Sequence, residues 1–464
     1  MVRGEAPVHD AVGPADLVML AMDDAAAVPE HLGALLILRP GPGFDLGAAE
    51  RLVAERARSV ARLRQRIGPG RGRPEWVEDA AFDPPRHLHH TRSGAPGDER
   101  ELLDIAAGAV LEPLPRDRPL WRAVFVEAGA GVVGVVLVVH HGLADGIGGL
   151  AVLERLLDDT RPPSPGTEGT VAPEARAGTA RSPRGRRSRV TAALRALRLS
   201  VAASGGLHAE RAAACSLLAP TGSRRRFATV EADLVSVREA AHRAGGSVND
   251  ALLAVTSAAL GDLLAHRGES VDTFRIAVPV AGRRSASPAG AGNAVAPLVV
   301  GIPARTDPAE TVRTLAPVLA TARRRTTAPA PIVLLWPLFR LLAATGLYHW
   351  YMTRQHRIHT LVSNVRGPDR VLHLAGAPVA RIVPLSVGEA GNTTVNFVAL
   401  SYAGTLTVSI VADPDQVPDL AVLTDALRAR LAALVTSPFL SQARRARGTL
   451  RAGPRPGPGP GRRG

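Results

Sequence analysis

Two adjacent histidines stand where an apolar run of the chain gives way to a glycine-rich segment. His140 and His141 follow the run Val132–Val139, and Asp145 and Gly146 come shortly after them. Adjacent residues at the end of a strand point to opposite sides, so this pair is poorly placed to chelate one metal ion. We expect one ring to face the core and the other to face a cleft. A neutral imidazole in a cleft can accept a proton from a hydroxyl group, which makes one of the two a candidate general base.

The residues after the histidines allow two interpretations. In the first, Asp145 shapes the turn or pairs with an arginine, and Gly146, Gly148 and Gly149 let a substrate approach the backbone closely. In the second, the histidines are a buried pair beside a glycine-rich turn and carry no chemistry. The sequence gives no grounds for a metal site. Cys215 is the only cysteine, and we expect it to be a small core residue rather than a nucleophile.

The elements that must position these residues follow from hydrophobic periodicity. In the first half of the chain, amphipathic patterns predict helices, and short apolar runs bounded by turn residues predict strands. The predicted helices are 14–24, 46–66, 101–111 and 145–157, and the predicted strands are 33–38, 123–127 and 132–139. The histidines therefore lie between a predicted strand and a predicted helix.

A stretch rich in Pro, Gly, Ser and Arg, residues 160–189, has no apolar periodicity and is predicted to be a flexible linker. The second half again mixes helices and strands, with Ser247 as the expected N-cap of one helix. Its predicted helices are 190–214, 235–244, 247–266, 307–326, 332–352 and 420–434, and its predicted strands are 227–234, 274–280, 296–302, 359–363, 380–385, 395–402 and 405–412. We divide the chain into a domain at 1–159, the linker, a domain at 190–440 and a basic tail at 441–464. The interface between two such domains is the natural ligand site.

The net charge of +14 raises the question of an anionic partner. Much of the excess lies in two low-complexity stretches, 181–189 and 444–463, and no motif or basic stripe points to nucleic acid. A single cysteine indicates a reducing compartment, and residues 1–10 lack the apolar core of a signal peptide. Residues 331–352 are the most membrane-like stretch, but proline and charge interrupt them. We expect a cytoplasmic protein that can lie on a membrane without crossing it.

Ordered motifs along the chain resemble those of a known family. The pattern His140-His141-x-x-x-Asp145-Gly146 is similar to the catalytic motif of the coenzyme A-dependent acyltransferase superfamily, which includes chloramphenicol acetyltransferase-like enzymes and peptide-synthetase condensation domains. Further matches narrow the resemblance to the bacterial wax ester synthase/diacylglycerol acyltransferase family. They include, in chain order, Pro119-Leu120-Trp121, Asn249-Asp250, Ser363-Asn364-Val365-x-Gly367-Pro368 and Ser401-Tyr402-x-Gly404. Arg366, where the family usually has proline, Gly142 and the long Arg/Pro-rich stretch after Arg161 depart from the pattern.

The resemblance implies an α/β fold of two chloramphenicol acetyltransferase-like domains, each a mixed sheet with flanking helices, with an active-site tunnel between them. On this basis His141 is the general base and Gly146 belongs to the catalytic motif. His140 and Asp145 hold the loop, and Arg283 is the candidate partner of Asp145.

Two pairs of polar residues in the second half are the other candidates for the site. Asn249 and Asp250 are either helix-capping residues or part of the active-site wall. Ser363 and Asn364 are expected to line the tunnel or to contact coenzyme A. The Pro119-Leu120-Trp121 motif is expected to pack the entrance of a strand, since large apolar side chains are usually buried.

The implied activity is direct transfer of an acyl group from acyl-CoA to a lipid alcohol, namely diacylglycerol or a long-chain alcohol. Acyl-CoA is then a co-substrate, and no permanently bound cofactor is expected. Two alternatives stay open: a superfamily enzyme that acylates another hydroxyl compound such as a polyketide or sugar, and a non-catalytic lipid-surface protein. Because the lipid acceptors are nearly insoluble, the resemblance also implies peripheral contact with a membrane or lipid droplet. Residues 331–352 and the Arg-rich tail are the predicted contacts.

Overall fold

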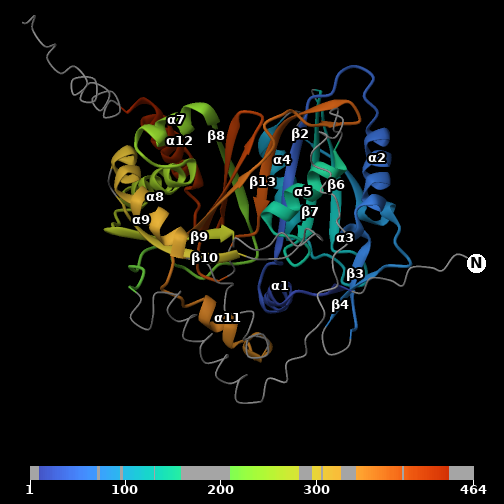
Figure 1. The fold of residues 1–464 in the computed structure, drawn as a ribbon, viewed down its shortest axis with the longest axis horizontal. Helices are drawn as coiled ribbons and strands as arrows, with labels where there is room; N and C mark the ends of the chain where they lie inside the picture. Colours follow the sequence, from blue (N-terminus) through green and yellow to red (C-terminus); the bar gives the residue numbers. More distant parts are fainter. Residues whose placement is uncertain are drawn as a thin grey trace, which may run out of the picture.

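The computed structural model of the chain describes residues 10–70, 74–94, 98–129, 131–157, 210–281, 295–304, 307–325, 341–388 and 391–437. Within these residues, two six-stranded sheets lie at the centre of the molecule, with most of the helices on the outside (Figure 1). A small third sheet joins β1 (Asp10–Ala11), β4 (Glu75–Glu78) and β3 (Gln65–Gly68). The predicted linker at 160–189, Arg283 and the tail at 441–464 lie outside the described residues.

The first sheet has the strand order β12-β13-β2-β7-β6-β5. Its strands are β2 (His31–Leu38), β5 (Leu88–Arg92), β6 (Trp121–Gly129), β7 (Val132–His140), β12 (His373–Leu374) and β13 (Ala377–Ser386). Its helices are α1 (Pro14–Ala25), α2 (Leu46–Ser59), α3 (Ala61–Arg64), the 3₁₀ turn η1 (Pro84–His87), α4 (Glu99–Leu111) and α5 (Gly146–Leu156). α5 contacts β2 and α2, while α4 contacts β2, β7 and β13. β7 is buried along most of its length, and its sequence is accordingly apolar almost throughout.

The second sheet has the strand order β10-β9-β11-β14-β15-β8. Its strands are β8 (Arg226–Asp233), β9 (Thr273–Ala281), β10 (Val295–Pro303), β11 (Thr360–Arg366), β14 (Val395–Tyr402) and β15 (Thr405–Ala412). Its helices are α7 (Leu234–Arg243), α8 (Val248–His266), α9 (Pro308–Arg325), α11 (Leu347–Met352) and α12 (Leu420–Thr436). The predicted N-cap of α8 is confirmed, because Ser247 and Asp250 form a reciprocal capping box.

Helix α8 is the centre of the second hydrophobic core. Among the described residues it is the helix that has the length and apolar composition to cross a membrane, but 78% of its apolar window is buried inside the protein. Its side chains pack with those of α9 and α12. These facts fit a core helix of a globular protein.

Two strands from the second half of the chain, β12 and β13, complete the first sheet. β13 pairs antiparallel with β2, so that Val383 lies opposite Leu35. Tyr402, on β14 of the second sheet, holds the β12–β13 hairpin: its hydroxyl accepts from the Leu372 N–H (2.8 Å) and donates to the Val379 carbonyl (2.9 Å). The first sheet therefore contains strands from both of the predicted ranges, 1–159 and 190–440.

Three predicted helices differ from the structure. The helix predicted at 46–66 is interrupted at Val60, which is extended and buried; the short helix α3 follows it, and the chain enters β3, which pairs with β4, only at Gln65. The helix predicted at 332–352 is interrupted at Gly346, whose φ of 72° is a left-handed conformation that ends a helical turn. Of the helix predicted at 190–214, the described residues 210–214 are not helical.

Candidate active site

His141 is positioned by the end of β7 and by the loop that precedes β2. At the end of β7, the His140 N–H donates to the Leu120 carbonyl (3.0 Å). The next residue leaves the strand, and the His141 N–H donates to the carbonyl of Glu30 (2.7 Å). A tight turn then brings the chain to α5. Strand, turn and helix therefore hold the backbone on both sides of this histidine.

The ring of His140 points into the core. Its side chain is only 1% exposed, and Nδ1 accepts a hydrogen bond from the Gly142 N–H (2.8 Å). Nε2 lies 3.4 Å from Oδ2 of Asp23 on α1. A Cβ atom at position 142 would come within 3.1 Å of His140 Nδ1 and 3.3 Å of the Asp16 carbonyl oxygen. The glycine at this atypical position therefore leaves room for the turn to close against the ring.

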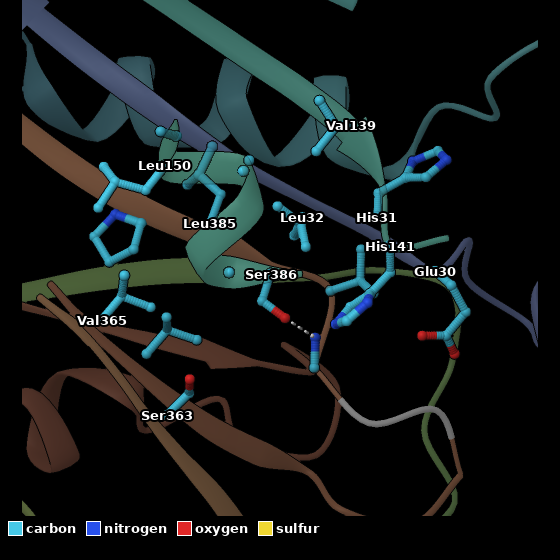
Figure 2. A pocket seen from close by; sticks show the side chains of 18 of the residues that line it. Glu30, His31, Leu32, Val139, His141, Leu150, Ser363, Val365, Leu385 and Ser386 are labelled. Carbon is cyan, nitrogen blue, oxygen red and sulfur yellow. Dashed lines mark hydrogen bonds between the residues drawn. The ribbon is translucent and has the colours of Figure 1, made fainter. Parts of the chain in front are cut away.

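His141 faces a cavity of about 210 Å³ between the two sheets. In Figure 2 its ring lies between Glu30 and Ser386, and Leu385, Val365 and Ser363 lie farther away on the side of Ser386. The lining is mainly apolar and comes from both halves of the chain. It includes Met19, Met22, Leu32, Val139, Leu150 and Leu153 from the first half and Pro279, Leu361, Val365, Leu385, Val398 and Leu400 from the second.

The neighbouring histidine of β2, His31, turns its ring away from this space. The His31 ring points away from the cavity in Figure 2, and its Nδ1 lies 2.9 Å from the Val110 carbonyl. Burial lowers the pKa of His31 to about 4, and the nearby His140 contributes to the shift. His31 is therefore neutral near pH 7 and is committed to the core.

Asp23, on α1, places a negative charge next to the ring of His140. Burial by itself would raise the pKa of its carboxyl, but His140, the Glu30 N–H and Arg116 together lower that pKa far below its ordinary value. The carboxylate accepts from the Glu30 N–H (2.7 Å) and from Arg116. Asp23 is therefore ionised at neutral pH and faces His140.

Some of the residues that the sequence predicted at the site line the cavity, and others do not. Gly146 and Ser363 line the cavity, but Asn364 does not. Ser363 and Asn364 are neighbours in β11, so their side chains point to opposite faces, and Asn364 is exposed. Both could not line one wall.

Asn249 and Asp250 are likewise absent from the cavity lining. Asp250 accepts from the N–H and the hydroxyl of Ser247 (both 2.8 Å) and so caps α8. The pair therefore lies outside the lining of this cavity, and Asp250 is the N3 residue of the capping box of α8. Asn249 is half-buried beside it.

Asp145 caps α5. Its side chain accepts from the Gly148 N–H (2.8 Å), and its backbone carbonyl accepts from the Gly149 N–H (2.7 Å). The hydrogen bond from the Gly148 N–H to the Asp145 side chain gives Asp145 a structural role, the capping of α5, that does not require an arginine partner. The predicted partner, Arg283, lies outside the described residues, so that pairing stays a prediction.

The Pro119-Leu120-Trp121 motif packs the start of β6, as predicted. Leu120 and Trp121 are buried, the Trp121 indole N–H donates to the Leu63 carbonyl (2.8 Å), and the ring stacks on His87 at 4.5 Å. The motif therefore anchors the strand beside β7. Arg366 is exposed and lies 3.2 Å from Asp369, so the residue that departs from the family pattern points away from the cavity.

Several lining residues were not predicted, and β13 and β14 contribute some of them. Ser386 and Asn396 line the cavity; the Gly388 N–H donates to the Ser386 hydroxyl (3.1 Å; Figure 2), and Asn396 Oδ1 accepts from the Leu361 N–H (3.1 Å). Asn396 is a polar residue within a buried apolar strand, which was the one signal available in the sequence. Ser386 could not be found, because nothing in the sequence places β13 beside β2.

Arg225 fixes the loop that follows β13. Its guanidinium is buried and donates to the carbonyls of Val387 (2.8 Å), Gly222 (2.8 Å) and Arg224 (2.7 Å). Burial lowers the pKa of Arg225, while the charge of Asp413 opposes this effect. Val387 lines the cavity, so this arginine holds part of its wall.

The described residues contain no group of three or more His, Cys, Asp or Glu side chains that could hold a metal ion. Two mixed sheets with a cavity between them, lined by a histidine from a His-His-x-x-x-Asp-Gly turn, define a member of the coenzyme A-dependent acyltransferase superfamily. Comparisons with known proteins give the family within it.

Residues 12–252 match the family model of the wax ester synthase/diacylglycerol acyltransferase catalytic domain, and residues 291–435 match that of the WS/DGAT C-terminal domain. The chain therefore belongs to the wax ester synthase/diacylglycerol acyltransferase family and is an acyltransferase. It is 31% identical over 370 residues to a protein of Mycobacterium tuberculosis that is named as a diacylglycerol O-acyltransferase, covering 75% of this chain and 73% of that protein.

Solved structures share the fold. The wax ester synthase/diacylglycerol acyltransferase from Marinobacter aquaeolei VT8 is similar with a TM-score of 0.64 at 22% identity, covering 92% of this chain and 98% of that one. A starter condensation domain of rhizomide synthetase in complex with C8-CoA is similar with a TM-score of 0.58 at 12% identity, covering 92% and 95%. The predicted fold of two chloramphenicol acetyltransferase-like domains is confirmed.

Proposed function

We propose that this enzyme transfers the acyl group of a long-chain acyl-CoA to the hydroxyl of diacylglycerol or of a long-chain alcohol, with His141 as the general base. The observation that carries the proposal is the place of His141 in a mainly apolar cavity lined by both halves of the chain. Apolar walls suit two lipid chains that meet at one polar group. The name of the mycobacterial relative and the C8-CoA bound to a structural relative support the acceptor and the donor, respectively.

The chemistry requires one base at the meeting point of the substrates. The His141 imidazole takes the proton of the acceptor hydroxyl as its oxygen attacks the thioester carbonyl carbon. The tetrahedral intermediate then collapses, the carbon–sulfur bond breaks, and the coenzyme A sulfur receives the proton back from the imidazolium. The proton returns to the leaving group, so the enzyme ends the cycle unchanged and no acyl-enzyme is formed.

The test is turnover of radiolabelled palmitoyl-CoA with a panel of acceptors by wild type, His141→Ala and His89→Ala. Loss of a positioned general base should lower turnover by a factor of about 100 to 10,000. His89 is an exposed histidine on β5 and serves as the matched control, which should keep wild-type turnover. Circular dichroism and thermal melting of each variant report whether it is folded.

The outcomes separate the alternatives. A folded His141→Ala variant with near-normal turnover would show that another group is the base. Turnover with a sugar or polyketide alcohol, but not with diacylglycerol or hexadecanol, would move the enzyme to another branch of the superfamily. Absence of turnover with every acceptor would favour a non-catalytic lipid-surface protein.

We also propose that the enzyme works at the cytoplasmic face of a membrane or on a lipid droplet, and that residues 341–352 make the contact. These residues do not pack into the second core. Ala343 and Tyr348 rest on α1, whereas Leu341, Leu347, Trp350 and Tyr351 are exposed on the same short segment. The Arg354 guanidinium lies 5.4 Å from the Trp350 ring and can reach lipid phosphate. A cluster of exposed apolar side chains beside a cation suits an anionic lipid surface.

Flotation with liposomes of phosphatidylcholine and phosphatidylglycerol tests this location. The wild type should float at low salt and less at high salt, since electrostatic attraction to anionic lipid is screened. Replacing Trp350 and Tyr351 together by Ser should reduce flotation, whereas Val235→Ser should not. Val235 is 53% exposed, close to the 54% of Trp350, but it lies on α7. A wild-type protein that stays at the bottom of the gradient at low salt would overturn this proposal and leave the transferase proposal intact.

A further inference from the structure

Asp23, near the end of α1, touches both sides of the loop that carries the base. Its Oδ1 accepts from the Glu30 N–H (2.7 Å), and its Oδ2 lies 3.4 Å from Nε2 of His140. The side chain is only 14% exposed, and Arg116 lies on its outer side. Its carboxylate is thus shared between the loop before β2 and the end of β7.

The first connection to His141 runs through Glu30. Asp23 holds the N–H of Glu30, and the carbonyl of Glu30 accepts from the N–H of His141 (2.7 Å). The peptide that enters His141 is therefore fixed to α1 through a single residue.

The second connection runs through the ring of His140. Nδ1 of His140 accepts from the Gly142 N–H (2.8 Å), so this nitrogen carries a lone pair rather than a proton. In the neutral ring the proton must then sit on Nε2, which is the nitrogen that faces the Asp23 carboxylate. A carboxylate at this place favours that tautomer, because it can accept from Nε2–H and cannot donate.

The two connections end on consecutive N–H groups, those of His141 and Gly142, which lie on either side of the His141 Cα. We propose that Asp23 is a positioning residue for the acyl transfer: its carboxylate fixes the backbone around His141 through Glu30 and through the tautomer of His140. This inference rests on the proposed function, because it assumes that His141 is the base. Small displacements of a catalytic group are costly, since a shift of about 1 Å can lower the rate by about 100-fold.

The test is Asp23→Asn, which keeps the size of the side chain. The Asn oxygen can still accept from the Glu30 N–H, but its NH₂ group would face the Nε2–H of His140, and two donors would meet. The ring must then move its proton to Nδ1, which can no longer accept from Gly142. We expect kcat to fall by about 10- to 100-fold while KM for palmitoyl-CoA changes by less than about twofold, because the lining of the cavity is untouched.

Asp24→Asn is the matched control. Asp24 also pairs with Arg116 (3.0 Å), but it is 75% exposed and has no described contact with His140 or Glu30. Its kcat should equal that of the wild type. A comparable loss of kcat in Asp24→Asn would overturn the inference, because it would assign the effect to Arg116 or to general charge.

The tautomer of His140 distinguishes the proposed role from simple stabilisation of the fold. If Asp23 only stabilised the fold, replacing it would not change which nitrogen of His140 carries the proton. Nitrogen-15 NMR of the protein with labelled histidine should show Nε2–H for His140 in the wild type and Nδ1–H in Asp23→Asn, with the signal assigned by its loss in His140→Gln. Asp23→Glu keeps an acceptor opposite Nε2 and should restore the Nε2–H form and part of kcat, which provides a test even if Asp23→Asn is poorly folded.

The result that overturns the inference is wild-type kcat in a folded Asp23→Asn variant, or an unchanged His140 tautomer. Failure of the proposed function appears elsewhere, as normal turnover of His141→Ala. A His141→Ala variant without turnover, together with a fully active Asp23→Asn variant, would reject the positioning role alone.

Discussion

Lowering the pH from about 7.5 to about 5 should lower the free energy of unfolding, and His31 should account for a definite share of this loss. Its pKa is lowered to about 4 in the folded protein, first because the ring is buried and second because His140 lies beside it, although the Val110 carbonyl opposes the shift. In the unfolded chain the same imidazole has a pKa of about 6.5. Between these two values the unfolded state binds more protons than the folded state, so the free energy of unfolding decreases as the pH falls.

The size of the effect follows from the two pKa values. Protonation of the unfolded chain at about pH 5, with the folded ring still neutral, lowers the free energy of unfolding by about 2 kcal/mol relative to about pH 7.5. Urea denaturation at both pH values should show this loss in the wild type and about 2 kcal/mol less of it in His31→Gln. His87 and His359, whose pKa values burial also lowers, contribute in the same direction but are present in both proteins and cancel in the difference.

The control for this measurement is His89→Gln, since His89 is exposed on β5. This variant should keep the pH dependence of the wild type. The reasoning is refuted if wild type and His31→Gln lose the same stability between the two pH values, because the ring would then titrate alike in the folded and unfolded states.

Variants at three further positions test the contacts described above. Asp145→Asn keeps an N-cap acceptor and should leave the free energy of unfolding nearly unchanged, whereas Asp145→Ala should lower it by about 1 kcal/mol in urea denaturation; a full loss of acyl transfer in a stable Asp145→Asn variant would instead reveal a need for the charge. Gly33→Ala should lower the free energy of unfolding by about 1–3 kcal/mol, because the new Cβ would overlap the Leu137 carbonyl oxygen, while Gly41→Ala, in open space, should not. Arg225→Met should cost about 2 kcal/mol or more and reduce turnover, because it leaves three backbone carbonyls without their donor; an unchanged melting temperature would contradict this role.

The parts of the site that the sequence predicted are those that depend on neighbouring residues. The sequence predicted β7, the capped helix α5 and the two histidines between them, whose rings face opposite sides. All of these lie within one short stretch of the chain, where the rules for periodicity and helix capping apply directly. The adjacent pair Ser363 and Asn364 was open to the same reasoning, because consecutive strand residues cannot face one cavity.

The parts that the sequence did not predict depend on distant partners. The amphipathic pattern of 46–66 continues past Ser59, but the extended, buried Val60 interrupts the helix, and pairing of β3 with β4 replaces helix from Gln65 onward. Asp23 has no local signal, because its role comes from His140 on a strand far along the chain. The wall formed by Leu385 and Ser386 depends on the pairing of β13 with β2, which no pattern within β13 announces.

The return of the chain into the first sheet makes the half that carries the histidines incomplete by itself. A fragment that stopped before residue 373 would leave the backbone N–H and C=O groups along one edge of β2 without partners, since β13 pairs with β2 from Leu32 to Leu38. Exposed strand edges of this kind recruit other chains and promote aggregation. Such a fragment would also lack Leu385 and Ser386, and with them one side of the space around His141. Two halves produced from separate genes could rebuild that space only by donating a strand from one to the other, as domain-swapped assemblies do.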